Sequence, residues 1–287
     1  MSKTFCYVNG QLLDSDQANI SVFDHGFTVA DGVFETLKFQ SGQPFAVDRH
    51  IKRLRKSCDG LGIAFPDEGT LRNAIDSVSQ ANGEIAQGRM RITVTSGNGP
   101  LGSDRINISP TLVISVAAQK PWADSSEVLL VPWIKNEKSP LVGLKTTSYA
   151  ENVYALEAAH EKGFSEAVFL SGQGLLSEGT GSNIFIVKNG EVLTPGTNSG
   201  LLEGITRELV LEWSTFPIFI KDLTEADLFE ADEVFITSST RDVHPVTRIA
   251  KLTEAKRVVN LKELSVGKVT SEIAMTFKKL SSERINP

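Results

Sequence analysis

The residues best suited to chemistry are a carboxylate and an amide within a stretch of small residues. Glu178 and Asn183 are separated by Gly-Thr-Gly-Ser, and the apolar pair Ile184-Phe185 follows them. Glycines let a backbone approach a bound molecule closely, so the two polar side chains could contact that molecule. A solvated turn explains the same pattern. The segment alone therefore leaves a ligand site and a plain turn open.

A predicted helix start offers a different kind of site, one that suits an anion. Gly204, Ile205 and Thr206 open a segment whose helical pattern extends to Trp213. The first N–H groups of a helix have no partner within the helix and carry partial positive charge, which favours a phosphate. The Thr206 hydroxyl lies beside them. An ordinary helix cap is the alternative.

Two further stretches carry groups that bind or react with small molecules. Thr237–Thr240 is a run of hydroxyl side chains after a predicted strand, where ligand-binding loops are common. Lys145 precedes a predicted helix, and a lysine amine can act as a nucleophile. Most such residues are simply solvated, so neither stretch indicates a site without support from the rest of the chain.

Strands and two helices are predicted before these candidates. Asn9-Gly10 between apolar flanks is a hairpin signal. Ile51, Leu54 and Cys58 recur at helical spacing. The predicted elements are a hairpin at Phe5–Leu13, strands at Val33–Phe39, Met90–Thr95 and Thr111–Val116, and helices at Asp48–Leu61 and Glu68–Ala81.

A polar segment at residues 118–126 is the predicted linker between two domains. Residues 1–117 form the smaller N-terminal α/β domain, and residues 127–287 form the larger C-terminal α/β domain, which carries Lys145. Strands are predicted at 128–133, 167–170, 183–188, 192–194, 216–220 and 233–237, with helices at 148–162 and 206–213. Mixed strands and helices with hairpin-like turns favour a two-domain α+β fold.

The composition of the chain argues against several classes of protein. Its 287 residues carry a net charge of −6 and no basic stripe, so a nucleic acid is not an expected partner. No apolar run is long enough to span a membrane. The four histidines are scattered and the two cysteines are far apart, which predicts no metal site and reduced thiols in a cytoplasmic protein.

Taken in order, the segments resemble the class IV aminotransferases, the fold-type IV pyridoxal-phosphate enzymes. From Glu178 the chain reads E-G-T-G-S-N-I-F, then V-L-T after six residues and L-E-G-I-T-R after seven more. Val8–Gly10, Asp31–Thr36, His50–Leu54 and Ala231–Phe235 also look like landmarks of that family. The similarity extends over nearly the whole chain.

The resemblance implies a role for each candidate residue toward pyridoxal 5′-phosphate. Lys145 is the expected catalytic residue, the lysine that forms a Schiff base with the cofactor. Glu178 is expected to face the pyridine nitrogen and Thr240 to lie where the substrate carboxylate binds. The residues expected around the phosphate are Arg53, Ile205, Thr206 and Ser239.

The resemblance leaves the reaction open between two outcomes. One is transfer of an amino group between an amino acid and a 2-oxo acid; the other is the 4-amino-4-deoxychorismate lyase reaction, which releases 4-aminobenzoate and pyruvate. A non-catalytic phosphate-binding protein is a third alternative. Tyr149 stands one position before the aromatic residue of the branched-chain enzymes, and Val29 replaces a tyrosine found in several aminotransferases. The resemblance also implies a homodimer.

Overall fold

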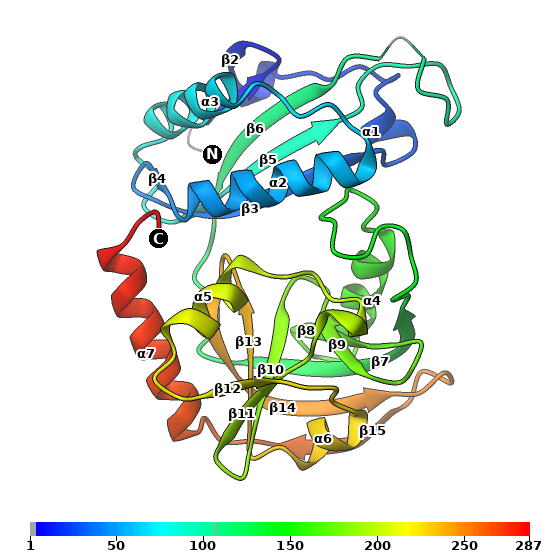
Figure 1. The fold of residues 1–287 in the computed structure, drawn as a ribbon, viewed down its shortest axis with the longest axis vertical. Helices are drawn as coiled ribbons and strands as arrows, with labels where there is room; N and C mark the ends of the chain where they lie inside the picture. The colour runs from blue at the N-terminus through cyan, green and yellow to red at the C-terminus, as the bar shows by residue number, and fades with distance from the viewer. Residues whose placement is uncertain (1–3, 107) are drawn as a thin grey trace. The chain divides into compact units, whose positions relative to one another are not determined.

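The computed structural model describes residues 4–106 and 108–287 and forms two compact units (Figure 1). The first unit extends to Pro121 and includes Leu144–Ser148 and Arg284–Pro287. The second comprises Trp122–Gly143 and Tyr149–Glu283. Each unit combines helices with a sheet, which confirms the predicted two-domain α+β fold.

The segment around Lys145 groups with the first unit, which differs from its predicted place in the C-terminal domain. Thr146 forms a β-bridge with Val33, and the N–H of Phe34 donates to the carbonyl of Lys145 at 2.8 Å. The segment therefore belongs to the first unit through its backbone pairing with residues 33 and 34, although it follows the predicted linker in the sequence. A segment this short has no periodicity that would reveal such pairing.

A six-stranded antiparallel sheet forms the frame of the first unit. Its order is β2-β1-β6-β5-β3-β4. The Asn9-Gly10 turn joins the first two strands as predicted, with both residues at positive φ. The strands are β1 (Phe5–Val8), β2 (Gln11–Asp14), β3 (Gly32–Gln40), β4 (Gln43–Pro44), β5 (Gly88–Thr95) and β6 (Thr111–Ala118).

Two amphipathic helices, α2 (Val47–Leu61) and α3 (Glu68–Ala81), cover one face of this sheet (Figure 1). Leu54 of α2 and Ile75 of α3 are buried in one apolar cluster with Ile92 of β5. The Asp67 side chain caps α3 by accepting from the N–H of Thr70. A short helix, α1 (His25–Thr28), precedes β3.

The sheet of the second unit closes into a ring of strands. Its order is β12-β11-β10-β13-β14-β7-β8-β9, and β9 also pairs with β10. Because β9 pairs with both β8 and β10, the strands from β10 through β9 surround an apolar core. The strands are β7 (Ser126–Lys135), β8 (Glu166–Ser171), β9 (Leu176–Gly179), β10 (Asn183–Lys188), β11 (Glu191–Thr194), β12 (Ile218–Ile220), β13 (Glu233–Ser238), β14 (Asp242–Leu252) and β15 (Val258–Glu263).

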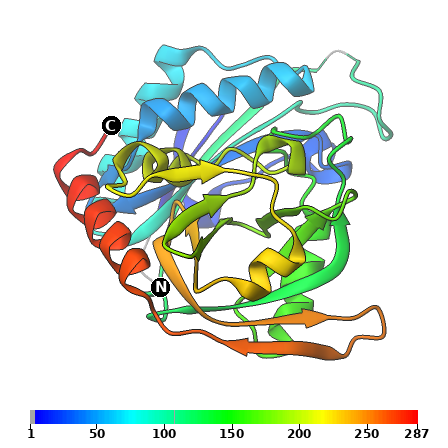
Figure 2. The ribbon, with the colours of Figure 1, turned by 60° about the horizontal axis from the view of Figure 1, so that its bottom comes forward.

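Helices pack against this ring, and Leu228 of one of them is buried in the apolar core that the strands surround. They are α4 (Ala150–His160), α5 (Ile205–Trp213), α6 (Glu225–Glu230) and α7 (Lys268–Glu283). The rings of Trp213 and Phe277 lie 5.3 Å apart where α5 meets α7. Figure 2 shows β14 and β15 as a long hairpin. No helix among the described residues is long and apolar enough to cross a membrane.

Candidate active site

Lys145 is held through its main chain by two elements of the first unit. Its carbonyl accepts from Phe34 on β3, and its N–H donates to the Ser57 hydroxyl on α2 at 3.1 Å. The next residue but one, Thr147, donates its N–H to Gly32 at 2.8 Å. The Lys145 Nζ lies 4.4 Å from the centre of the Phe34 ring. The amine therefore extends from a fixed backbone over an aromatic face.

Arg53, predicted to bind the cofactor phosphate, lies on α2 and pairs with a buried carboxylate. Its Nε donates to Oε1 of Glu35 at 2.8 Å and its Nη2 donates to Oε2 at 2.7 Å. Two parallel hydrogen bonds fix the plane of a guanidinium as well as its position. Glu35 lies on β3 and is fully buried.

His50 completes this cluster on the other side of Glu35. Its Nδ1 lies 2.7 Å from Oε2 of Glu35, and because a carboxylate only accepts, Nδ1 carries the proton. Burial would raise the pKa of Glu35, but Arg53 and then His50 lower it to about 2. Burial lowers the pKa of His50, against the effect of Glu35, and the charges of Arg53 and Lys145 lower it further. The sequence offered Glu35 and His50 only as landmarks.

Glu178 lies on β9 in the second unit and is almost fully buried. Its Oε1 is 2.9 Å from Nζ of Lys135 on β7, and its Oε2 accepts from the N–H of Leu202 at 2.9 Å. Both oxygens are thus oriented by partners that lie far away in the sequence. Lys135 was not singled out by the sequence, because no local spacing connects it with Glu178.

The helix start at Gly204 has the features of an anion site. Gly204 is the residue before α5, and no side chain caps this helix end. A Cβ at Gly204 would lie 2.0 Å from Oδ1 of Asn183, so a larger residue fits there only if Asn183 or the helix start moves. Asn183 in turn donates to the carbonyl of Leu202 at 2.8 Å. The N–H groups of Ile205 and Thr206 lie in the uncapped first turn, and this donor set fits a phosphate.

Ser239 and Thr240 occupy the turn between β13 and β14. Trp122 donates its Nε1–H to the carbonyl of Thr240 at 2.9 Å, and Arg241 donates its N–H to the carbonyl of Ser238 at 3.3 Å. The main chain of the turn is therefore held by hydrogen bonds to the carbonyls of Ser238 and Thr240.

Strand register places the candidates of the second unit at one end of the ring. Glu178 on β9 is opposite Asn183 on β10, and Asn183 is opposite Thr237 on β13, just before the turn at Ser239. The start of α5 contacts Asn183. The second unit thus gathers Glu178, Ile205, Thr206, Ser239 and Thr240, while Arg53 and Lys145 both act on His50 in the first unit.

The comparisons with known proteins agree with the resemblance. The family model described as "Amino-transferase class IV" matches residues 32–249. The aminodeoxychorismate lyase of Bacillus subtilis is 30% identical over 286 residues, which cover 95% of this chain and 93% of that protein. The D-alanine aminotransferase of Bacillus licheniformis is 30% identical over 84% of this chain and 87% of its own.

A solved structure is similar over the same extent. The branched-chain aminotransferase of Thermoproteus uzoniensis, solved with norvaline, has a TM-score of 0.88 and 26% identity, and the match covers 97% of this chain and 95% of that one. The chain belongs to the class IV aminotransferase family and is an enzyme of that family.

Proposed function

We propose that the protein is a pyridoxal-phosphate-dependent aminotransferase that moves an amino group between an amino acid and a 2-oxo acid. The observation that carries this proposal is the geometry of Lys145. Its backbone is fixed by β3 and α2, and its amine lies over Phe34 in the unit that also holds Arg53. A lysine held in this way can move a proton at the substrate α-carbon repeatedly from one position.

Different residues would hold different parts of the cofactor. The N–H groups of Ile205 and Thr206, the Ser239 hydroxyl and the Arg53 guanidinium would bind the phosphate, because they combine helix-end donors with a cation. Glu178 would accept a hydrogen bond from the protonated pyridine nitrogen and so keep the ring protonated. When bound, pyridoxal phosphate supplies an electron sink for the charge left at the α-carbon. Thr240 would hold the substrate carboxylate.

A second candidate reaction is the 4-amino-4-deoxychorismate lyase reaction. It is favoured by the relative from Bacillus subtilis, which matches nearly the whole chain. Both reactions need Lys145 to remove the same α-proton, so the residues described above serve either one. They differ in whether a leaving group departs before the proton returns.

We also propose that the protein is a cytoplasmic homodimer. Two segments of the first unit expose apolar side chains, and the N–H of Gly99 in one donates to the carbonyl of Phe23 in the other at 3.1 Å. Several exposed apolar side chains on neighbouring segments favour an interface with a second copy. The exposed apolar residues of these segments are Ile20, Val22, Phe23, Phe27, Val29, Leu101 and Ile106.

The proposed cytoplasmic location is supported by the cysteines. Both cysteines are free and buried, as expected of a protein from a reducing compartment.

The test begins with cofactor attachment. After incubation with pyridoxal phosphate and reduction with borohydride, mass spectrometry should place the cofactor mass on the peptide that contains Lys145. Lys145→Ala should abolish this attachment, whereas Lys138→Ala, a change at an exposed lysine of the same loop, should retain it. Failure of the wild-type protein to take up the cofactor would contradict the proposal and favour a non-catalytic phosphate-binding protein.

Turnover then separates the two reactions. The enzyme is supplied with amino acids and 2-oxoglutarate in one assay and with aminodeoxychorismate in the other. New amino acid in the first assay alone supports the aminotransferase. Aromatic amine and pyruvate in the second assay alone would replace it with the lyase.

A further inference from the structure

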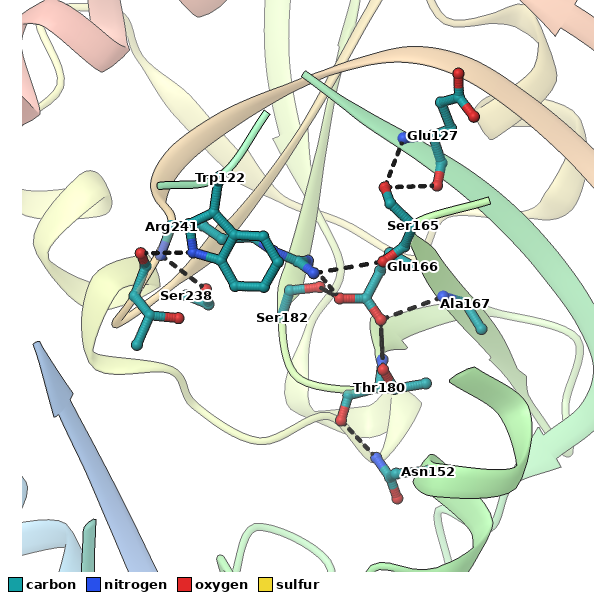
Figure 3. Close-up of polar contacts among 11 residues, drawn as sticks. Trp122, Glu127, Asn152, Ser165, Glu166, Ala167, Thr180, Ser182, Ser238 and Arg241 are labelled. Carbon is teal, nitrogen blue, oxygen red and sulfur yellow. Dashed lines mark hydrogen bonds and ion pairs between the residues drawn. The ribbon is translucent and has the colours of Figure 1, made fainter. Parts of the chain in front are cut away.

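A buried carboxylate outside the candidate site organises the second unit near Ser239 and Thr240 (Figure 3). Glu166, on β8, is 1% exposed. Its Oε1 accepts from both the N–H and the hydroxyl of Thr180, the former at 3.0 Å, and its Oε2 accepts from the Ser182 hydroxyl at 3.1 Å. The Thr180 and Ser182 hydroxyls of the glycine-rich signature therefore face Glu166.

Arg241 supplies the positive charge that this carboxylate needs. Its Nη1 donates to Oε2 of Glu166 at 2.7 Å, and its Nη2 lies 3.4 Å from the carbonyl of Ser165. The guanidinium also stacks 4.1 Å from the centre of the Trp122 ring. The Arg241 side chain is 8% exposed. Removing either charge would leave the other buried without compensation, which is strongly unfavourable.

The backbone around Arg241 links this ion pair with the turn between β13 and β14. Arg241 donates its own N–H to Ser238, while Trp122, on which it stacks, donates to the carbonyl of Thr240. The residues on either side of Ser239 and Thr240 are therefore connected to Glu166 through Arg241, which pairs with Glu166 and stacks on Trp122. Asn152 on α4 donates to the carbonyl of Thr180 at 2.8 Å and anchors the opposite side of the network.

We propose that Glu166, Arg241 and Trp122 are positioning residues that fix the turn carrying Ser239 and Thr240 for the cofactor phosphate and the substrate carboxylate. This inference rests on the proposed function. Arg241 acts through the turn and is not itself a substrate ligand, because its guanidinium is occupied by Glu166, Ser165 and Trp122.

The chain offers a closely matched control for Arg241. Arg248, also on the second unit, pairs with Glu127, donates to the carbonyl of Gly163 at 2.7 Å and stacks 4.6 Å from the Phe164 ring. It makes the same three kinds of contact, but with partners that do not include the Ser238–Arg241 turn. Arg241→Met and Arg248→Met therefore remove the same kinds of contact at different places, although the Glu127 side chain is 38% exposed and that of Glu166 only 2%.

The experiment compares the wild-type holoenzyme with Arg241→Met, Arg241→Lys and Arg248→Met. Arg241→Met should raise KM for the amino substrate about 10- to 100-fold and leave kcat within about 3-fold, because a loosened anchor weakens ground-state and transition-state binding alike. Arg241→Lys should restore part of the loss, since it keeps the charge beside Glu166. Arg248→Met should leave KM unchanged.

A second readout does not depend on activity. In the cofactor-free protein, hydrogen exchange of the amides of residues 239–241 should be about 10-fold faster or more in Arg241→Met than in Arg248→Met. Unchanged exchange would overturn the proposed positioning. Faster exchange with an unchanged KM would overturn the link between the turn and the substrate.

The choice of substrate separates positioning from direct binding. If Arg241 bound substrate directly, Arg241→Met would raise KM for dicarboxylic substrates and spare monocarboxylic ones, and this result would also overturn the proposal. Equal losses for both classes, together with the faster exchange in the cofactor-free protein, support it. A wild-type protein that takes up no cofactor would instead refute the proposed function itself.

Discussion

At the scale of single residues, the cluster around Glu35 shows how a cation is fixed before any ligand arrives. Glu35 is fully buried, yet it receives both parallel hydrogen bonds from Arg53 and one from His50. Burial would raise the pKa of Glu35, but the charges and hydrogen bonds of Arg53 and His50 together outweigh that effect. A guanidinium fixed in its plane loses little freedom when it binds an anion, so Glu35 would support phosphate affinity without contacting the phosphate.

This cluster predicts a loss of stability in acid. The pKa of His50 is lowered from 6.5 in the folded protein, and that of Glu35 is lowered from 4.5 to about 2. The unfolded chain therefore takes up protons that the folded chain refuses, first at His50 below about pH 6.5 and then at Glu35 below about pH 4.5. For Glu35 the difference of about 2.5 pKa units corresponds to about 3 kcal/mol, present above pH 4.5 and lost toward pH 2.

Urea unfolding of wild type and Glu35→Gln over a range of pH tests this prediction. The variant should be less stable by about 3 kcal/mol near neutral pH, and the difference should shrink as the pH falls. Glu272→Gln, at a half-exposed ion pair on α7, is the control and should change stability by less than about 1 kcal/mol. A constant difference between wild type and Glu35→Gln at every pH would contradict the assignment.

The pair between Lys135 and Glu178 leads to a prediction about cofactor affinity. Lys135 is 27% exposed, so water screens part of its attraction to Glu178, and we expect the contact to contribute about 1 kcal/mol. Lys135→Met should release one carboxylate oxygen and raise the dissociation constant for pyridoxal phosphate about 5-fold. Lys138→Met, at an exposed lysine nearby, should leave it unchanged. Equal or tighter binding by Lys135→Met would show that Lys135 does not orient Glu178.

At the scale of elements, helix caps and hydrophobic spacing in the sequence predicted those helices and turns whose stabilising contacts are local. Helix α3 has the predicted bounds, because Asp67 caps it and Leu71, Ile75 and Val78 recur at helical spacing. Helix α7 was not predicted, and its buried stripe consists of Thr270, Ile273, Phe277 and Ser281. Two of these four residues are polar, although Ile273 and Phe277 recur at helical spacing.

The same distinction applies to the candidate site. The segment from Glu178 to Thr206 is recognisable because its residues are close together in the sequence. Glu35, Lys135, Glu166 and Arg241 act through partners that are distant in the sequence, and only the tertiary fold brings each pair together. The bridge that joins Lys145 to β3 has the same origin.

The start of α5 provides a prediction at the element scale. Gly204→Ala would place a Cβ 2.0 Å from Oδ1 of Asn183, so either the Asn183 side chain or the helix start must shift. We expect a loss of about 2 kcal/mol in the free energy of unfolding and a rise of about 10-fold or more in the dissociation constant for pyridoxal phosphate. Gly181→Ala is the matched control, because a Cβ at Gly181 meets open space. Equal behaviour of the two variants would contradict the close approach.

At the scale of the whole molecule, the chain leaves and rejoins the first unit more than once. Leu144–Ser148 returns to it from the second unit, and Arg284–Pro287 returns again at the end, where the N–H of Ala46 donates to Ile285 at 2.8 Å. Division at the predicted linker would therefore separate Lys145 from Phe34 and Ser57, which hold its backbone. The proposed chemistry requires both units in one chain, although each has its own core.

The exposed apolar surface of the first unit supports a prediction about assembly. Phe27 on α1 is 69% exposed and belongs to the surface proposed as the homodimer interface. Phe27→Asp would bury a charge there, so the dissociation constant of the dimer should rise about 100-fold, or about 3 kcal/mol. Analytical ultracentrifugation over a range of protein concentrations measures this change. Phe219→Asp alters an exposed phenylalanine on β12 of the second unit and should leave the dimer intact. If wild type sediments as a monomer, or if Phe27→Asp dimerises as tightly as wild type while circular dichroism shows it folded, this surface does not form the interface.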